Sequence, residues 1–448
     1  MVELAYPPIA KHRGYLFWLN PANLWASRRV AKADYSNEWR HAFEAGHPPP
    51  VSRSASFATL LGTPATPASF KFIIVGDTGE GDRSQYGLVP LMRAARPDFM
   101  VVNGDVAYPA GRYEDFVAGF FQPYRNFDIP IWGTPGNHEY YSEHNGREFY
   151  DLFCTYKGSE LWSSHGLRLV PQPGMYWELS DPEGRAKLVV IGIDSGKKAN
   201  LDGHTGLWSK INPFDHDKHP DTEQHEWLEW RLGLANARGD AVMVLYHIPA
   251  LVSRRHDGDT HLGALHRMLA RHPSVRAVIC GHIHNYQRYA PATFAEYCAR
   301  QHGAQRAGHG PPYYIVSGNG GATLDGTLFK HDDYPVEDDV FPSEQQWKDY
   351  VGRAQRLVDA VGFGKSLLSR TLGLFKETAA KDADAAQFLS FLLVEVNGPT
   401  TSVSVVRMED LEALFSRQPN GTRINVDDAV ALLDPDALAR CTTHLFDL

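Results

Sequence analysis

Short apolar runs that end beside a glycine and a polar residue recur along the chain, and they limit its fold more than any other feature. The runs are rich in Val, Ile and Phe, which is typical of buried strands. They cover residues 70–75, 99–102, 129–132, 188–191, 241–245, 275–280 and 313–316. Helical patterns at 222–237 and 261–271 separate several of them. Strand–helix alternation of this kind predicts an α/β fold in which a buried sheet is covered by helices.

Six polar motifs follow one another at the ends of apolar runs. They are GDTG (76–79), GDVAY (104–108), GNHE (136–139), YH (246–247), RHDG (255–258) and GHIH (281–284). In open α/β sheets, ligands gather at the carboxyl ends of the strands, and the candidate donors fall at or just beyond those ends. The sequence therefore predicts one site that is built from several strand ends.

The donor atoms of these motifs suit metal ions. Each residue alone has an ordinary explanation, because a strand-end Asp is usually a helix cap and a lone His is usually structural. Together they supply carboxylate, amide oxygen and imidazole, which suit Zn, Mn or Fe better than Ca. There are enough donors for two ions, and two metals roughly 3.5–4 Å apart can clamp the attacking and leaving oxygens of a displacement. The donors are Asp77, Asp105, Asn137, His247, His282 and His284.

The order of the motifs resembles a known family. GDTG, GDVAY, GNHE, YH and GHIH are similar to the calcineurin-like metallophosphoesterase superfamily over about residues 70–325. Most of that superfamily begins with Asp-x-His, whereas Gly79 stands at the third position here, and Tyr108 completes the GDxxY pattern of purple acid phosphatases. Within the superfamily, the chain thus resembles a purple acid phosphatase. The resemblance implies a two-sheet β-sandwich flanked by helices, with the metals at the carboxyl ends of the strands.

The resemblance also implies the ligands of each ion. A ferric ion would be held by Asp77, Asp105, Tyr108 and His284. A divalent Fe, Zn or Mn ion would be held by Asn137, His247 and His282, with Asp105 bridging the two ions. The phenolate would stabilise Fe(III), and charge transfer from phenolate to iron gives this family its purple colour.

Two further histidines resemble catalytic residues of the family. His138 follows the Asn ligand and would point at the phosphate, while His256 resembles a proton donor to the leaving group, although RHDG departs from the family pattern. His144 and His261 are reserve candidates. Behind the ligands, supporting contacts are expected from Asp194, Glu139 and His261.

The implied reaction is hydrolysis of a phosphate monoester, in which a metal-bound hydroxide attacks phosphorus and a His protonates the leaving oxygen. A ferric-bound hydroxide persists at low pH, so activity in mildly acidic conditions is expected. The same metals could hydrolyse diesters, including cyclic nucleotides. A non-catalytic phosphate-binding scaffold is a weaker alternative, and a metallopeptidase is disfavoured because the chain has no HExxH motif.

The composition limits which kinds of partner and which location are expected for the chain. The net charge of −9 gives no footprint for a nucleic-acid duplex, so a small phosphorylated substrate is the expected partner. The four cysteines are scattered and predict reduced thiols rather than a disulfide framework. No secretory signal and no transmembrane segment are visible, which favours a cytoplasmic location.

The remaining segments suggest how the chain is divided. The predicted division is an N-terminal extension (1–69), a catalytic domain (70–340), a helical insertion (341–390), and closing strands with a mostly helical tail in the same domain (391–448). Residues 357–376 could form a lid or contact a membrane surface, or simply pack as helices on the sheet.

Overall fold

The computed structural model covers the core of the chain. It describes residues 3–5, 44, 52–79, 81, 83–142, 144–195, 222–252, 262–303, 310, 312–322, 338–340, 389–408, 414 and 423–448. The candidate histidines 256 and 261, the segment 357–376 and nearly all of the predicted insertion lie outside these residues.

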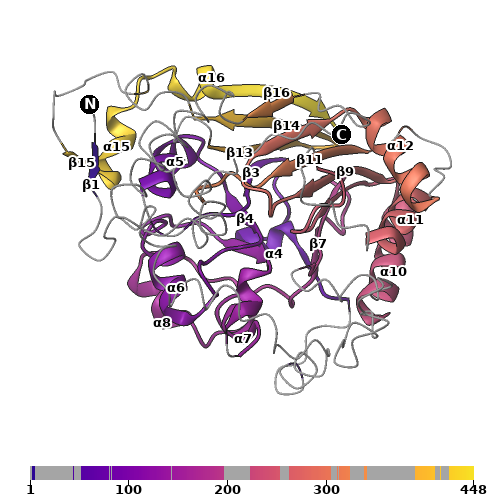
Figure 1. The fold of residues 1–448 in the computed structure, drawn as a ribbon, viewed down its shortest axis with the longest axis horizontal. Coiled ribbons are helices and arrows are strands. Elements are labelled where there is room, and N and C mark those ends of the chain that lie inside the picture. The colour runs from indigo at the N-terminus through magenta and orange to yellow at the C-terminus, as the bar shows by residue number, and fades with distance from the viewer. Residues whose placement is uncertain are drawn as a thin grey trace, which may run out of the picture.

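Two large sheets form the centre of the molecule (Figure 1). The eight-stranded sheet has the order β12 (Asp338–Val340), β10 (Tyr286–Tyr289), β11 (Tyr313–Ser317), β9 (Val275–Cys280), β8 (Ala241–Leu245), β7 (Leu188–Gly192), β6 (Trp177–Ser180) and β2 (Ser54–Ser56). The six-stranded sheet has the order β16 (Thr442–Asp447), β14 (Thr400–Arg407), β13 (Ser390–Asn397), β3 (Ser69–Val75), β4 (Phe99–Asn103) and β5 (Ile131–Thr134). A small parallel pair joins β1 (Glu3–Ala5) to β15 (Arg423–Asn425).

The inner faces of the two sheets pack against each other. Phe72 and Ile74 of β3 belong to the same buried cluster as Met243 and Leu245 of β8. The alternate residues of β3, Ile73 and Val75, belong to a different cluster on the outer face. This two-residue period is what a strand buried on both faces requires. The predicted two-sheet sandwich is therefore confirmed.

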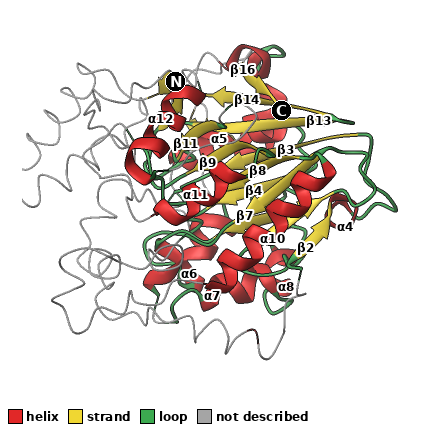
Figure 2. Ribbon diagram, turned by 90° about the vertical axis from the view of Figure 1, so that its right-hand side faces the viewer, coloured by secondary structure: helices red, strands yellow, loops and turns green. Residues whose placement is uncertain are grey.

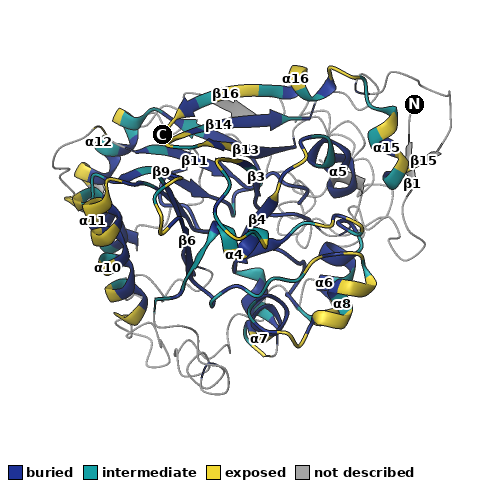
Figure 3. Ribbon diagram, turned by 180° about the vertical axis from the view of Figure 1, so that it is seen from behind, coloured by how far each residue is buried: buried dark blue, intermediate teal, exposed yellow. Residues whose placement is uncertain are grey.

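Helices cover both outer faces (Figure 2). The eight-stranded sheet is covered by α10 (Thr222–Arg238), α11 (Gly263–Arg271) and α12 (Pro291–His302). The six-stranded sheet carries α5 (Arg83–Ala94) and α15 (Val426–Leu432). Exposed residues lie on the outward sides of these helices, while the strands are mostly buried (Figure 3). The helices predicted at 222–237 and 261–271 correspond to α10 and α11.

Shorter helices connect these layers. They are α4 (Phe57–Leu61), α6 (Tyr113–Phe116), η2 (Val117–Phe121), η3 (His138–Tyr141), α7 (Arg147–Phe149), η4 (Tyr150–Cys154), α8 (Ser159–Ser164) and α16 (Ala437–Cys441). Within the described part of the chain, no helix has the length and apolar character needed to cross a bilayer.

The C-terminal tail differs from its prediction. Residues 442–447, expected to lie in a mostly helical tail, form the edge strand β16, which pairs with β14. An edge strand has only one neighbour, and β16 fully buries only Phe446, so it lacks the apolar alternation that would reveal a strand. The predicted hairpin that precedes it is present as β13 and β14, joined around Gly398.

Parallel pairing brings the motifs to one edge. β3, β4 and β5 pair in parallel, and so do β8 and β9, so the polar residues after these strands emerge on the same side of each sheet. Asn103, the last residue of β4, ties the two sheets together there. Its Nδ2 donates to the carbonyl oxygens of Tyr246 (3.3 Å) and Ile279 (3.1 Å), and its Oδ1 accepts from Thr134 (3.0 Å).

Candidate metal centre

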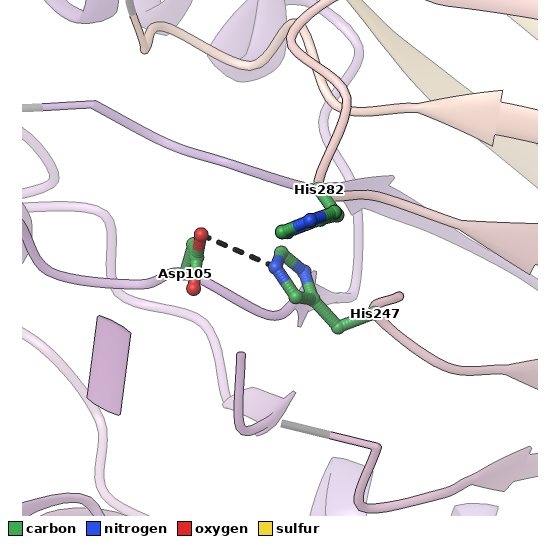
Figure 4. Close-up of side chains that lie close together, drawn as sticks. All are labelled: Asp105, His247 and His282. Atoms are coloured by element: carbon green, nitrogen blue, oxygen red, sulfur yellow. Dashed lines mark ion pairs between the residues drawn. The ribbon is translucent and has the colours of Figure 1, made fainter. Parts of the chain in front are cut away.

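Two groups of donors converge where the sheets meet. Asp105, His247 and His282 form one group, and Asp77, Asp105 and His284 form the other. Within each group the potential ligand atoms all lie within 4.8 Å of one another. Figure 4 shows Asp105, His247 and His282 directed toward a common point. Asp105 belongs to both groups, which is the arrangement that a shared carboxylate between two ions requires.

The backbone is strained at three of these donors. Asp77 (φ 54°), Asp105 (φ 49°) and His282 (φ 70°) all adopt the left-handed conformation that residues with a Cβ usually avoid. Each such residue costs roughly 1–3 kcal/mol and persists only where the surroundings enforce it. Three strained residues around one point indicate a site selected for function rather than for stability.

Each carboxylate has one oxygen fixed by the backbone and the other facing the centre. Asp77 Oδ2 accepts from the backbone N–H of His282 (2.8 Å), and Asp105 Oδ1 accepts from that of His138 (2.9 Å). The remaining oxygens lie near imidazoles, with Asp77 Oδ1 at 3.3 Å from His284 Nε2 and Asp105 Oδ2 at 3.2 Å from His247 Nε2. The backbone hydrogen bond to one oxygen of each carboxylate therefore directs its other oxygen toward the centre.

The Tyr108 hydroxyl lies between two carboxylates and an imidazole. It is 3.1 Å from Asp77 Oδ1, 3.2 Å from Asp105 Oδ2 and 3.0 Å from His284 Nε2. One phenolic proton is thus shared between two carboxylate oxygens, which can only accept when ionised. Burial, and then the charges of Asp105 and Asp77, raise the pKa of the phenol. A multivalent cation among these groups would offset the negative charge and favour the phenolate.

Hydrogen bonds hold both the ring and the backbone of His247. Its Nδ1 lies 3.1 Å from the carbonyl oxygen of Asn103, which can only accept, so Nδ1 carries the proton and Nε2 faces the centre. Its backbone N–H donates to Ser195 Oγ (2.8 Å). Burial opposes protonation of this ring, but the carboxylates of Asp105 and Asp77 raise its pKa to about 9. Positive charge is therefore favoured at this position.

His138 is oriented in the same way. Its Nδ1 donates to the carbonyl oxygen of Pro109 (2.7 Å), which leaves Nε2 directed toward the centre, 3.9 Å from Asp105 Oδ2. The side chain is partly exposed. Burial lowers the pKa of His138, while the charge of Asp105 opposes this shift. His138 also affects Asp105 in turn: burial opposes ionisation of that carboxyl, but His247 and His138 hold its pKa well below the usual range.

Glu139 joins the two loops that carry these residues. The fully buried carboxylate accepts the backbone N–H groups of Val106 (2.9 Å), Ala107 (3.1 Å) and Gly136 (2.7 Å). Burial and the charge of Asp105 raise the pKa of Glu139 to about 8, while the N–H groups favour its ionised form. Glu139 therefore holds the loop after β4 against the loop after β5.

Two glycines of the motifs are required by close contacts. A Cβ at Gly104 would lie 2.2 Å from His247 Nδ1, and one at Gly136 would lie 2.1 Å from Asp105 Oδ1. Both contacts are much shorter than real Cβ atoms allow. Glycine at these positions therefore lets the donors approach one another.

The sequence-predicted residues differ in how near the centre they lie. Eight of them come together: Asp77, Asp105, Tyr108, Asn137, His138, His247, His282 and His284. Asp194 is not part of either donor group, and its Oδ2 accepts a hydrogen bond from the Tyr140 hydroxyl (2.5 Å). His144 is exposed, and His256 and His261 lie outside the described residues.

Sequence reasoning missed three residues that hold the donors. Asn103 accepts a hydrogen bond from the His247 ring and donates to the other sheet. Ser195 accepts hydrogen bonds from the backbone N–H groups of His247 and Ile248. The Tyr141 hydroxyl accepts a hydrogen bond from the Asn137 amide. Asn103 and Ser195 directly adjoin recognised polar residues at strand ends, which was the only signal available. Tyr141 carries no motif, since its role depends on the turn made by η3.

The donor set fits two metal ions. One group combines the oxygens of Asp77, Asp105 and Tyr108 with the His284 imidazole. The other combines the Asn137 amide oxygen with the imidazoles of His247 and His282. Mixed nitrogen and oxygen donors suit Fe, Zn or Mn. The two buried carboxylates beside the Tyr108 hydroxyl and the raised pKa of His247 both indicate a place that stabilises positive charge.

Comparison with known families agrees with this geometry. Residues 70–286 match the model of the family described as calcineurin-like phosphoesterase. That segment begins in β3 and ends in β10, and it includes every donor that converges on the centre. No curated protein matches the chain.

Several solved structures are similar to the chain. A purple acid phosphatase from yellow lupin (Lupinus luteus) seeds is 13% identical with a TM-score of 0.42, and the alignment covers 77% of this chain but 52% of that one. GAP50, the anchor in the inner membrane complex of Plasmodium, is 12% identical with a TM-score of 0.47, covering 82% and 95%. A dimetal phosphatase from Danio rerio is 18% identical with a TM-score of 0.37, covering 57% and 88%. The chain thus spans about half the length of the lupin phosphatase.

The role of Glu139 can be tested by removing one acceptor. In Glu139→Gln, the amide nitrogen cannot accept a hydrogen bond, so at least one of the three N–H groups loses its partner. We expect the free energy of unfolding to fall by about 1–3 kcal/mol, measured by urea denaturation at pH 5, where the buried Glu139 carboxyl is neutral like the amide. At higher pH, ionisation toward its raised pKa of about 8 destabilises the wild type and would mask the loss. Glu160→Gln, at an exposed position on α8, serves as the matched control. Equal stability of the Glu139 variant and wild type would contradict the assignment.

Proposed function

We propose, from the premise that residues 70–286 are a calcineurin-like phosphoesterase domain and the chain a metal-dependent phosphatase, that the protein hydrolyses phosphate monoesters of small molecules. The observation that carries the proposal is the position of Asp105, whose carboxylate is shared by two donor groups. A dinuclear site suits phosphoester hydrolysis because two cations can neutralise the charge of the transferring phosphoryl group.

The proposed ligands are divided between two ions. Fe(III) would be held by Asp77, Asp105, Tyr108 and His284, and a divalent Fe, Zn or Mn ion by Asp105, Asn137, His247 and His282. The contacts of the Tyr108 hydroxyl with Asp77 and His284 support the first set. The 3.2 Å approach of Asn137 Oδ1 to His247 Nε2 supports the second. When bound, such ions polarise the phosphoryl group and lower the pKa of water from roughly 15.7 to 7.

His138 is the proposed general acid. The Pro109 carbonyl holds the proton of Nδ1, so Nε2 is the atom that can carry a second proton to the leaving oxygen. The ring lies against that of Tyr108, with centroids 4.3 Å apart, and 14% of the His138 side chain is exposed. His256 is retained as a second proposed proton donor, from the sequence pattern alone.

The metal content of the purified protein tests the proposal first. We expect iron together with a second metal, and a purple absorption band from phenolate-to-iron charge transfer. In Tyr108→Phe the band should disappear, because the substituted ring has no oxygen to bind iron. Elemental analysis and a visible spectrum measure both. A colourless wild-type protein with two Zn or Mn ions would contradict the ferric assignment but keep a dinuclear hydrolase.

The role of His138 is tested by the leaving group. In His138→Ala, we expect kcat to fall by about 10²–10⁴-fold on an alkyl phosphate, whose leaving oxygen needs a proton. The loss should be much smaller on a nitrophenyl phosphate, and the metal content should be unchanged. His444→Ala, at an exposed position of β16, is the control. An equal loss on both substrates would show that His138 is not the general acid.

A comparison of a monoester substrate with a diester substrate tests which kind of ester the protein prefers. We expect faster turnover of an aryl phosphate than of a bis-aryl phosphate, measured as kcat/KM at the same metal occupancy. The reverse order would favour the alternative, a phosphodiesterase that could include cyclic nucleotides among its substrates. Absence of turnover on both, with metals bound, would favour a phosphate-binding scaffold.

A further inference from the structure

A pair of tyrosines ends the short helix that follows the GNHE motif. Tyr140 and Tyr141 are consecutive residues of η3, but their hydroxyls reach different partners. Tyr140 is buried, and its hydroxyl donates to Asp194 Oδ2 (2.5 Å). Tyr141 is partly buried, and its hydroxyl oxygen accepts from Nδ2 of Asn137 at 2.7 Å. Of these two hydroxyl bonds, it is the bond of Tyr141 that reaches a residue of the candidate centre.

The bond to Tyr141 matters because an amide has two unlike ends. The oxygen of Asn137 can bind a cation, whereas its NH₂ group can only donate hydrogen bonds. With Tyr141 holding Nδ2, Oδ1 is turned inward, 3.2 Å from His247 Nε2. A rotation of the amide by half a turn would put the NH₂ group against that imidazole and remove the oxygen from the donor set.

Tyr141 is itself held in place by a neighbouring ring. Its ring centroid lies 4.8 Å from that of His138 at an interplanar angle of 57°. The His138 ring is fixed in turn by the bond of its Nδ1 to the Pro109 carbonyl. The backbone N–H of Tyr140 also donates to the carbonyl of Asn137 (3.2 Å), which closes the turn of η3. These contacts give the Tyr141 hydroxyl a defined position relative to the amide.

We propose that Tyr141 is a positioning residue, which presents Asn137 Oδ1 to the divalent ion of the centre. The inference rests on the proposed function, because it assumes that a metal ion binds between Asn137, His247 and His282. It assigns Tyr141 no contact with the reacting atoms. Groups that orient a ligand from behind commonly contribute 10- to 100-fold, roughly, to metal affinity.

The test is a Zn²⁺ titration of the full chain after removal of its metals. Wild type should bind two Zn²⁺ ions. In Tyr141→Phe, we expect one of the two affinities to fall about 10- to 100-fold while the other stays at the wild-type value, since the ring remains but the acceptor of the amide is lost. Tyr140→Phe removes the neighbouring hydroxyl of the same helix and should retain both affinities.

The outcomes separate this inference from the proposed function. Failure of wild type to bind any Zn²⁺ ion would overturn both. Two ions in wild type with unchanged affinities in Tyr141→Phe would overturn the role of Tyr141 alone, as would an equal loss at both sites or the same loss in Tyr140→Phe. As a second readout, excess Zn²⁺ should restore the kcat of Tyr141→Phe, because a weakened site refills, and a failure to restore it would count against positioning.

Discussion

The burial of two carboxylates at the junction of the sheets is the constraint on which the rest of the site depends. Asp77 and Asp105 are almost fully removed from solvent, and an unpaired buried charge is strongly unfavourable. In the structure, a backbone N–H group donates a hydrogen bond to one oxygen of each carboxylate, and an imidazole lies close to the other oxygen. Both contacts stabilise the buried negative charge. The backbone at both residues adopts the left-handed conformation that residues with a Cβ usually avoid.

The sandwich supplies the two halves of the centre from different sheets. β3, β4 and β5 are followed by Asp77, Asp105 and Asn137, whereas β8 and β9 are followed by His247 and the GHIH motif. The distance between the halves is set by the packing of the inner faces and by the hydrogen bonds that the Asn103 side chain makes to both sheets. A displacement of one sheet would change the geometry of the whole centre, so core packing and the site are coupled.

The predictions from sequence succeeded where a local pattern was strong. The long apolar runs and helix α10 were recognised because burial on both faces, or along one stripe, leaves a clear periodicity. Short strands such as β6 and the edge strand β16 were missed. β6 contains the buried Glu178, which pairs with Arg231 of α10, and that partner lies far away in the sequence. A polar residue in a strand reads as exposed until its partner is known.

The sequence by itself determined which residues could come together. The residues that follow parallel strands emerge at one edge of the sheet, and the motifs give the types of those residues. Tertiary structure alone decided how the donors are aimed. The hydrogen bonds of His247 to Asn103 and Ser195 join residues 144 and 52 positions apart, and no local pattern encodes them. The orientation of the Asn137 amide also depends on Tyr141, four residues along a turn that only the folded chain defines.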